Sequence, residues 1–181
     1  MGGLDNRLGV GRCVPEEPRV RRRARLRTKE TKELRDRLAA ALGGADLWGE
    51  TAAVETGEFN DRALVLVDNR LHGLWTGMDM AAAPFLTVRG LLHYKPTARY
   101  VTVDMGAVKF VVNGADVMAP GIVEADPALQ VGDWCWIRDE KNRQPLAVGQ
   151  CLVPGAAMPR GKGKAVKSIH HLGDKIWLLE P

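Results

Sequence analysis

The chain has 181 residues, and 45% of them are hydrophobic, which is enough for one large core or two small ones and too much for wholesale disorder. No apolar run reaches the roughly 18 residues that cross a bilayer, and the first residues lack the apolar segment of a secretory signal, so we expect a cytoplasmic protein without a membrane partner. The net charge of +4 is uneven: residues 1–30 carry nine Arg or Lys against four Asp or Glu, residues 155–181 carry five against two, and the middle carries twelve against sixteen. Basic ends indicate either a polyanionic partner or charge that only aids solubility.

The first 29 residues hold a tail and a basic segment. Residues 1–18 are rich in glycine and proline and have few large apolar side chains, so they are predicted to be a flexible tail. Residues 19–29, "RVRRRARLRTK", alternate in part between basic and other residues, which suits an extended strand with one basic face or an unstructured arm. In either form the segment offers cations to phosphates, and the candidates are Arg21, Arg22 and Arg23.

A helix and several short strands are predicted next. The helix has Thr28 as its N-cap, an apolar face at helical spacing, and an end at Gly43 and Gly44. Strands are expected at residues 51–55, 63–67 and 70–75, with a turn at Asp68 and Asn69 between the last two. A short helix is expected to start at Pro84. The sequence "KPT" at residues 95–97 breaks the pattern and is the predicted domain boundary.

The second half alternates apolar runs with turn residues. Strands are expected at residues 99–104, 133–140, 144–153, 164–172 and 175–180, with a hairpin turn near Asn142 and another at Gly173 and Asp174. Many short strands in about 80 residues predict a small barrel or sandwich with mixed pairing. Its core is expected to be anchored by Trp134, Trp136 and Trp177.

The stretch "DMGAVKFVVNGADVMAPGI", residues 104–122, is not a nucleotide-binding loop. Its two Gly-Ala pairs are eight residues apart, which fits neither the Rossmann GxGxxG nor the Walker GxxxxGK pattern. Eight residues make about two helical turns. The spacing therefore predicts a short helix with Asp104 as N-cap and Gly114 at its end, followed by a strand entered through "VMAPGI". Lys109 falls on the side of this helix opposite its valines.

A second glycine-rich stretch, "MPRGKGKAVKSIHHL", lies near the C-terminus. Its glycines let a backbone approach a ligand closely, and its cations attract phosphates without directional preference. The basic residues are Arg160, Lys162, Lys164 and Lys167. Alone, this stretch could equally be a solvated lysine-rich loop.

Four separated motifs now carry a resemblance: "VTVDMGAVKFVVNGADVMAPGI", "VGDWCWI", "PLAVGQ" and "GKGKAVKSIHHLGDKIW". Together, over about residues 98–179, they resemble a PUA domain, the RNA-binding module named for pseudouridine synthases and archaeosine transglycosylases. Residues 19–97 more loosely resemble the pre-PUA domain, which precedes PUA in archaeal stand-alone proteins and in the family called multiple copies in T-cell lymphoma. The resemblance implies an α+β fold, with a pre-PUA α/β domain at 19–97 and a PUA pseudobarrel of mixed strands at 98–181.

The resemblance also implies an RNA-facing groove formed by the first helix of the PUA domain and the strand after it. By position, its residues are Gly114, Ala115, Asp116, Met118, Pro120 and Gly121. Lysines of the penultimate strand flank it, here Lys162, Lys164 and Lys167, and we add Arg160 and Lys109 at its edge. The implied function is a non-catalytic RNA-binding protein, with tRNA or rRNA as partner and the small ribosomal subunit or a translation factor as a further candidate.

Two other functions stay open on the sequence. An RNA-modifying enzyme, or an accessory subunit of one, is the first; against the enzyme, the residues before the PUA region are few and contain no paired acid and base or activated nucleophile. A protein-interaction adaptor in a translation-initiation complex is the other, with the acidic middle as the docking surface.

Cysteines and histidines predict no metal site and no cofactor. The chain has no CxxC pair and no HExxH pattern. Cys135 and Cys151 are expected at nearly opposite positions of one hairpin, where reduced thiols are favoured over a disulfide.

Overall fold

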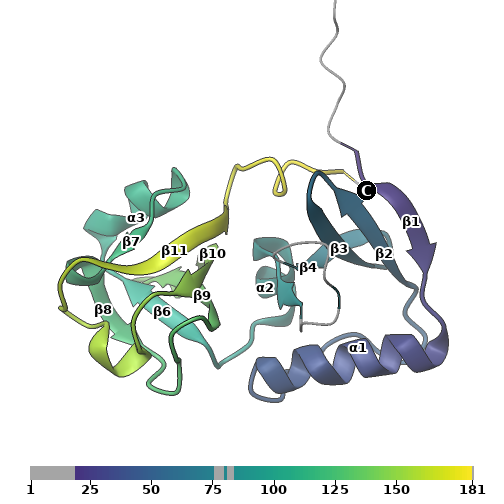
Figure 1. Cartoon of the computed structure of the whole chain (residues 1–181), viewed down its shortest axis with the longest axis horizontal. Helices are drawn as coiled ribbons and strands as arrows, with labels where there is room; N and C mark the ends of the chain where they lie inside the picture. The colour runs from purple at the N-terminus through teal and green to yellow at the C-terminus, as the bar shows by residue number, and fades with distance from the viewer. Residues whose placement is uncertain (1–18, 76–79, 81–83, 181) are drawn as a thin grey trace, which may run out of the picture.

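The computed structural model describes residues 19–75, 80 and 84–180, which form two β-sheets arranged end to end (Figure 1). The first sheet is antiparallel, with the order β1-β2-β3-β4-β5; its strands are Arg21–Arg25, Val54–Phe59, Arg62–Val67, Arg70–Leu74 and Phe85–Leu86. The helices of this half are α1, Thr28–Ala41, and α2, Val88–Tyr94. The predicted tail at residues 1–18 lies outside the described residues.

The second sheet is mixed and curves into a nearly closed pseudobarrel. Its order is β7-β11-β10-β9-β6-β8, and β6 and β9 are parallel. In chain order the strands are β6 Tyr100–Val103, β7 Val117–Met118, β8 Ile122–Ala125, β9 Trp134–Asp139, β10 Pro145–Cys151 and β11 Lys164–His171. Helix α3 is Met105–Val112, and two short 3-10 helices are η1, Ala119–Gly121, and η2, Gly155–Ala157. The expected α+β fold is confirmed.

Helix α1 covers one face of the first sheet. Its N-cap is Arg27 rather than Thr28, and the Arg27 amide donates to Glu30 Oε2 at 2.8 Å. The buried face of the helix consists of Leu34, Leu38 and Leu42, as the apolar spacing predicted. The helix ends at Gly43 and Gly44, both with positive φ.

Strand β3 is buried on both faces. Val65 and Val67 belong to the core under α1, whereas Leu64 and Leu66 belong to a second apolar cluster on the opposite face. That second cluster is completed by Ile176 and Leu179 from the C-terminal segment. In Figure 1 this segment, drawn in yellow, leaves β11 and crosses to the side of β1. The last described residue, Glu180, forms an isolated bridge with Arg19.

Three expected elements of the first half are present, two of them with shifted starts. The strand expected at residues 51–55 begins at Val54, and the hairpin of β3 and β4 turns at Asp68 and Asn69, whose φ angles of 48° and 61° suit this tight turn. The second helix begins at Val88 rather than Pro84, because residues 85–86 pair with β4. The Thr87 hydroxyl then accepts from the Gly90 amide and caps the helix.

Two expected strands of the second half are wrong in part. The run "VMAPGI" is interrupted by η1, so β7 and β8 are separate strands in different places of the sheet. Residues 175–180 form turns instead of a strand, since the Asp174 carboxylate accepts from the Trp177 amide at 2.7 Å and the Asp174 carbonyl from the Leu178 amide at 3.0 Å. Strand β11 is therefore the final strand rather than the penultimate one.

The three tryptophans join the two halves instead of anchoring the second core. The Trp134 ring stacks on Phe85 at 5.6 Å, and Trp136 is buried in the core that α1 covers. The Arg89 guanidinium lies 5.1 Å from the centre of the Trp177 ring and donates to the Trp177 carbonyl at 2.7 Å. The two sheets thus share an apolar interface, and the boundary at residues 95–97 stays a prediction.

The second core is built mainly from small aliphatic residues and contains both described cysteines. Cys135 and Cys151 are free and buried. A hydrogen bond with Cys151 and burial raise the pKa of the Cys135 thiol well above its usual value. The Cys135 thiol is thus held in its protonated form.

Candidate nucleic-acid interface

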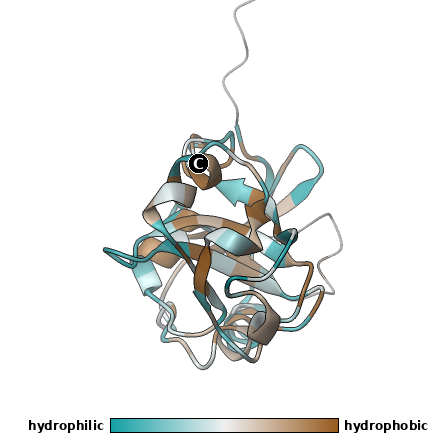
Figure 2. Ribbon diagram, turned by 90° about the vertical axis from the view of Figure 1, so that its left-hand side faces the viewer, coloured by the Kyte–Doolittle hydropathy of each residue, from teal (hydrophilic) through white to brown (hydrophobic). Residues whose placement is uncertain are grey.

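A groove of about 690 Å³ lies between α3, β7 and η1. Six residues that the resemblance assigned to RNA line it, namely Ala115, Asp116, Met118, Pro120, Gly121 and Lys164. Six further lining residues were not predicted: Asp104, Gly106, Ala107, Phe110, Val111 and Val117. The lining is mostly apolar, with carboxylates and one ammonium group among it. Seen from the end that carries α3, hydrophilic segments gather in the outer loops and hydrophobic ones lie toward the middle (Figure 2).

The two walls of the groove are fixed to each other at the start of α3. The Asp104 carboxylate accepts from the Ala107 amide at 2.8 Å, which confirms Asp104 as the N-cap. The Asp104 amide in turn donates to the Gly121 carbonyl at 2.9 Å. A Cβ on Gly121 would lie 3.0 Å from the Ala107 Cβ, so glycine allows η1 to approach the helix this closely.

Gly114 positions α3 but does not line the groove. Its φ is 82°, as expected of a glycine after a helix end. A Cβ there would lie 2.6 Å from Nε2 of His171 on β11. Gly114 therefore sets how close the end of α3 comes to the last strand.

Asp116 links the groove to β11. Its carboxylate accepts from the Ser168 amide and from the Lys164 ammonium, both at 3.0 Å. These two bonds, the Ser168 one foremost, hold the pKa of the Asp116 carboxyl below its usual value, and the charge of Lys167 adds to the effect. Lys167 is exposed and has no ion pair with any described residue, so its charge is available to a ligand.

The groove has an exposed aromatic ring on its helical side. Phe110 is 57% exposed, and Met118 on the opposite side is 48% exposed. Lys109, predicted to point outward, does so, with its ammonium 4.9 Å from the centre of the Phe110 ring. Phe110 was not predicted, because only the valine face of the helix was interpreted; the available signal was a lone aromatic residue off that face.

Arg160 and Lys162 lie in the loop before β11, outside the groove lining. The loop is tied to η1 and β8, since the Ala119 amide donates to the Gly163 carbonyl at 2.9 Å and the Arg160 amide to the Ile122 carbonyl at 3.2 Å. Both basic side chains are exposed. Their loop leads directly into Lys164, the first residue of β11.

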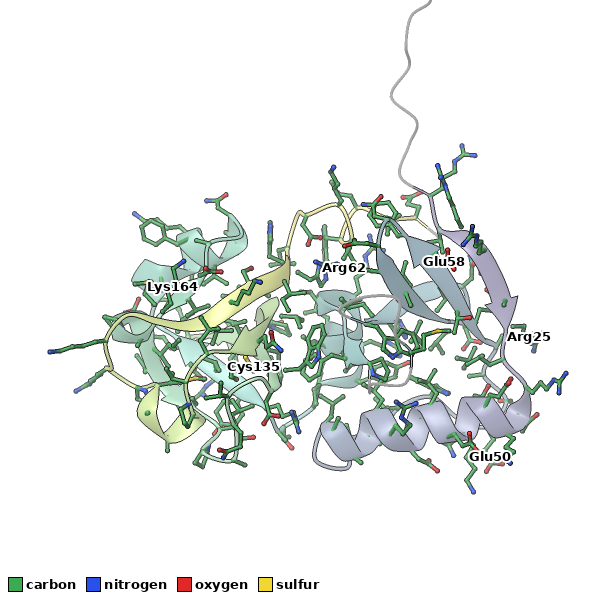
Figure 3. The ribbon with its side chains drawn as sticks, in the orientation of Figure 1. Arg25, Glu50, Glu58, Arg62, Cys135 and Lys164 are labelled. Carbon is green, nitrogen blue, oxygen red and sulfur yellow. The ribbon has the colours of Figure 1, made fainter. Side chains whose placement is uncertain are left out.

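The arginines of β1 lie in the other sheet. Figure 3 places Lys164 at the α3 end of the molecule and Arg25 and Glu58 at the opposite end. Arg22 pairs with Glu58 at 3.1 Å, and Arg23 pairs with Glu55 and donates to Asn69. Arg21, Arg22 and Arg23 are thus not brought together with the groove residues, and two of them already have carboxylate partners.

The PUA domain family model matches residues 99–172. An uncharacterized protein of Methanocaldococcus jannaschii is 37% identical over 160 residues, which cover 87% of this chain and 96% of that protein. The chain belongs to the stand-alone PUA-domain proteins. The crystal structure of a hypothetical protein from Pyrococcus horikoshii agrees, with 35% identity, a TM-score of 0.76, and coverage of 86% of this chain and 98% of its own.

Eukaryotic relatives of this PUA protein match over a shorter stretch. Translation machinery-associated protein 20 of Saccharomyces cerevisiae is 36% identical over 95 residues, 48% of this chain and 52% of that protein. Malignant T-cell-amplified sequence 2 of Mus musculus is 31% identical over 102 residues, 54% of this chain and 56% of its own. The match spans about half the length of these relatives. The predicted resemblance to PUA proteins of the archaeal stand-alone kind and to the T-cell lymphoma family is confirmed.

Within residues 19–75, 80 and 84–180, no three His, Cys, Asp or Glu side chains are grouped as a metal ion would need. In the same ranges no helix is long and apolar enough to cross a membrane.

Proposed function

We propose that this PUA protein is a non-catalytic RNA-binding protein of the translation machinery that works in the cytoplasm and holds a tRNA or rRNA segment in the groove of α3, β7 and η1. One observation carries the proposal: an apolar groove with an exposed phenylalanine ring is flanked by the lysines of β11. Unstacked RNA bases stack on aromatic side chains, and lysines attract the phosphates between them.

The link to translation is supported by the name of the yeast relative, which is associated with the translation machinery. The small ribosomal subunit or a translation factor is therefore the further partner that we propose. A non-catalytic role is supported by the state of the two groove carboxylates. Asp104 caps α3 and Asp116 is bonded to Lys164 and Ser168, so neither is a free general acid or base.

Fluorescence anisotropy with labelled bulk tRNA at low salt tests the groove. We expect Phe110→Ala to weaken binding about tenfold, because one base–aromatic stack contributes about 1–3 kcal/mol. Lys164→Gln combined with Lys167→Gln should weaken it at least as much at low salt. Lys32→Gln, an exposed charge on α1, is the matched control and should leave binding unchanged.

Three results would contradict the proposal in different ways. Binding that is equal in all variants would exclude this groove as the RNA surface, and no binding at low salt would exclude RNA as the partner. Uridine isomerisation or base exchange on tRNA by the purified protein would exclude the non-catalytic role.

A further inference from the structure

Two hollows of about 420 and 640 Å³ meet where α2 lies beside β4 in the first half of the chain. Arg70, His72 and His93 line both of them. Neither hollow shares a residue with the groove of α3, so this region is separate from the proposed RNA groove. The lining of the two hollows also differs in chemistry from that of the α3 groove, because it contains basic and aromatic side chains where the groove is mostly apolar.

The smaller hollow is basic and contains no carboxylate among its described lining residues. Besides the three shared residues, it is lined by Arg89 and Leu92. Arg70 is exposed and has no hydrogen bond or ion pair with any described residue. Arg89 is held in place through the Trp177 carbonyl, yet its Nε is buried without a hydrogen-bond partner. Two arginines with no carboxylate in the lining of this hollow favour an anion here, and Asp68, which lines the larger hollow, is the negative charge that opposes it.

The larger hollow presents flat rings. The imidazoles of His72 and His93 stack with centres 5.0 Å apart and planes 25° apart, and the Tyr94 ring meets both edge-on. Trp48 also lines this hollow; it is 5% exposed and its Nε1 is buried without a hydrogen-bond partner. Rings next to a cationic hollow match the two parts of a nucleotide, since bases stack on rings and phosphates pair with guanidinium groups.

We propose that the two hollows together bind a nucleoside phosphate, with the phosphate between Arg70 and Arg89 and the base against His93 and Tyr94. Arg89 and Trp48, one lining residue of each hollow, both carry a buried nitrogen donor that lacks a hydrogen-bond partner. This site does not depend on the function proposed for the α3 groove.

The electrostatics of His72 support an anion. Burial, then the charges of His93 and Arg70, lower the pKa of His72 to about 4, and only Asp68 opposes them. The His72 Nδ1 lies 2.8 Å from the Tyr94 hydroxyl, on the α2 side. His72 is therefore neutral at pH 7 in a positive surrounding. A phosphate bound beside it adds negative charge and must raise this pKa, which proton NMR of the imidazole ring can follow.

Calorimetric titration of the full chain with AMP, adenosine and inorganic phosphate tests the site. We expect AMP to bind and to raise the titration midpoint of His72, with adenosine and phosphate each binding more weakly. Arg70→Gln should weaken AMP binding about tenfold, the effect of one lost charge-assisted contact. Lys32→Gln removes an exposed charge from the same half without touching either hollow, and should leave AMP binding unchanged.

The nucleotide can be free or part of RNA, and a third titration distinguishes these sources. A 5′-phosphorylated oligoribonucleotide that binds more tightly than AMP in Phe110→Ala protein identifies an RNA strand; equal affinity identifies a free nucleotide. Three results would overturn the site: no heat and no ring shift with AMP, equal affinity for AMP and inorganic phosphate, or equal weakening by Arg70→Gln and Lys32→Gln. AMP binding that survives the loss of tRNA binding separates this site from the function proposed above.

Discussion

At the scale of single residues, Gly114 is constrained both by a positive φ and by a neighbour in the space that a Cβ would fill. Gly132 has only the first of these constraints and is therefore its control. Gly114 and Gly132 have φ angles of 82° and 88°, but only Gly114 has a neighbour, His171, in the space a Cβ would fill. We expect Gly132→Ala to cost about 1 kcal/mol for the left-handed backbone alone. Gly114→Ala should cost about 2–4 kcal/mol, because overpacking adds to it. Urea unfolding of both variants measures the difference, and equal costs would show that His171 gives way freely.

Asp116 predicts a pH dependence with a definite sign. Its folded-state pKa is lowered by Ser168 and Lys164, so its stabilising effect is present above the ordinary carboxyl value of 3.8 and is lost as the pH falls through the lower folded value. Asp116→Ala should therefore cost about 1 kcal/mol at pH 7, the usual net value of a hydrogen bond. Below pH 3.8 wild type and variant should converge. Urea unfolding at pH 7 and pH 3 tests this, and a difference that grows toward acid would contradict it.

At the scale of elements, β11 and β1 are the two basic strands, and they should respond differently to salt. Lys167 forms no ion pair within 19–75, 80 and 84–180, whereas Arg23 is engaged by Glu55 and Asn69. We expect Lys167→Gln to reduce the slope of log affinity for RNA against log salt by about 0.7, the value for one phosphate contact of a single strand. Arg23→Gln should leave the slope unchanged. Anisotropy titrations at several salt concentrations measure both slopes, and an equal reduction would place β1 on the RNA surface as well.

Elements that depend on neighbours along the chain could be predicted from the sequence. The helix ending at Gly43 and the turn at Asp68 and Asn69 require only local backbone preferences, and both are where they were expected. Residues 175–180 failed because a short apolar run does not distinguish a strand from a turn. There the deciding contact is a side chain to backbone bond from Asp174, which alternation does not encode.

In the candidate site, too, the residues of a local motif could be predicted from the sequence, and a residue placed by tertiary packing could not. Ala115, Asp116, Met118, Pro120 and Gly121 were predicted together because they belong to one motif, and all five line the groove. Phe110 belongs to the same groove but lies one turn earlier, on a helix whose apolar face was already assigned to the core. Whether Phe110 lines the groove depends on how α3 is turned against the barrel. The spacing of the valines of α3 does not determine that orientation.

At the scale of the whole molecule, the C-terminal segment joins the halves. Leu178 and Leu179 are adjacent, but Leu178 is 60% exposed and Leu179 is fully buried in the cluster with Leu64 and Leu66. Leu179→Ala should destabilise the protein by about 2–4 kcal/mol, the usual cost of such a cavity. Leu178→Ala should cost less than about 0.5 kcal/mol, as exposed substitutions do. Thermal or urea unfolding measures both, and similar values would mean that the segment is not held against the first sheet.

The joint between the halves was not predictable from the sequence. Trp134 and Trp177 are ordinary core residues by composition, and their partners across the joint, Phe85 and Arg89, are far from them along the chain. Only the relative placement of the two sheets selects those partners. The interface is therefore a product of tertiary packing, and the periodicity of apolar residues cannot predict it.

Synthesis on the ribosome runs from the first sheet to the second, and domains generally fold in the order in which they emerge. In this chain β3 emerges early, with the leucines of its outer face uncovered. Ile176 and Leu179, which cover that face, emerge after every strand of both sheets. The half that is made first is consequently the half that is completed last, and its outer apolar surface stays partly uncovered from the synthesis of β3 until the last residues are made.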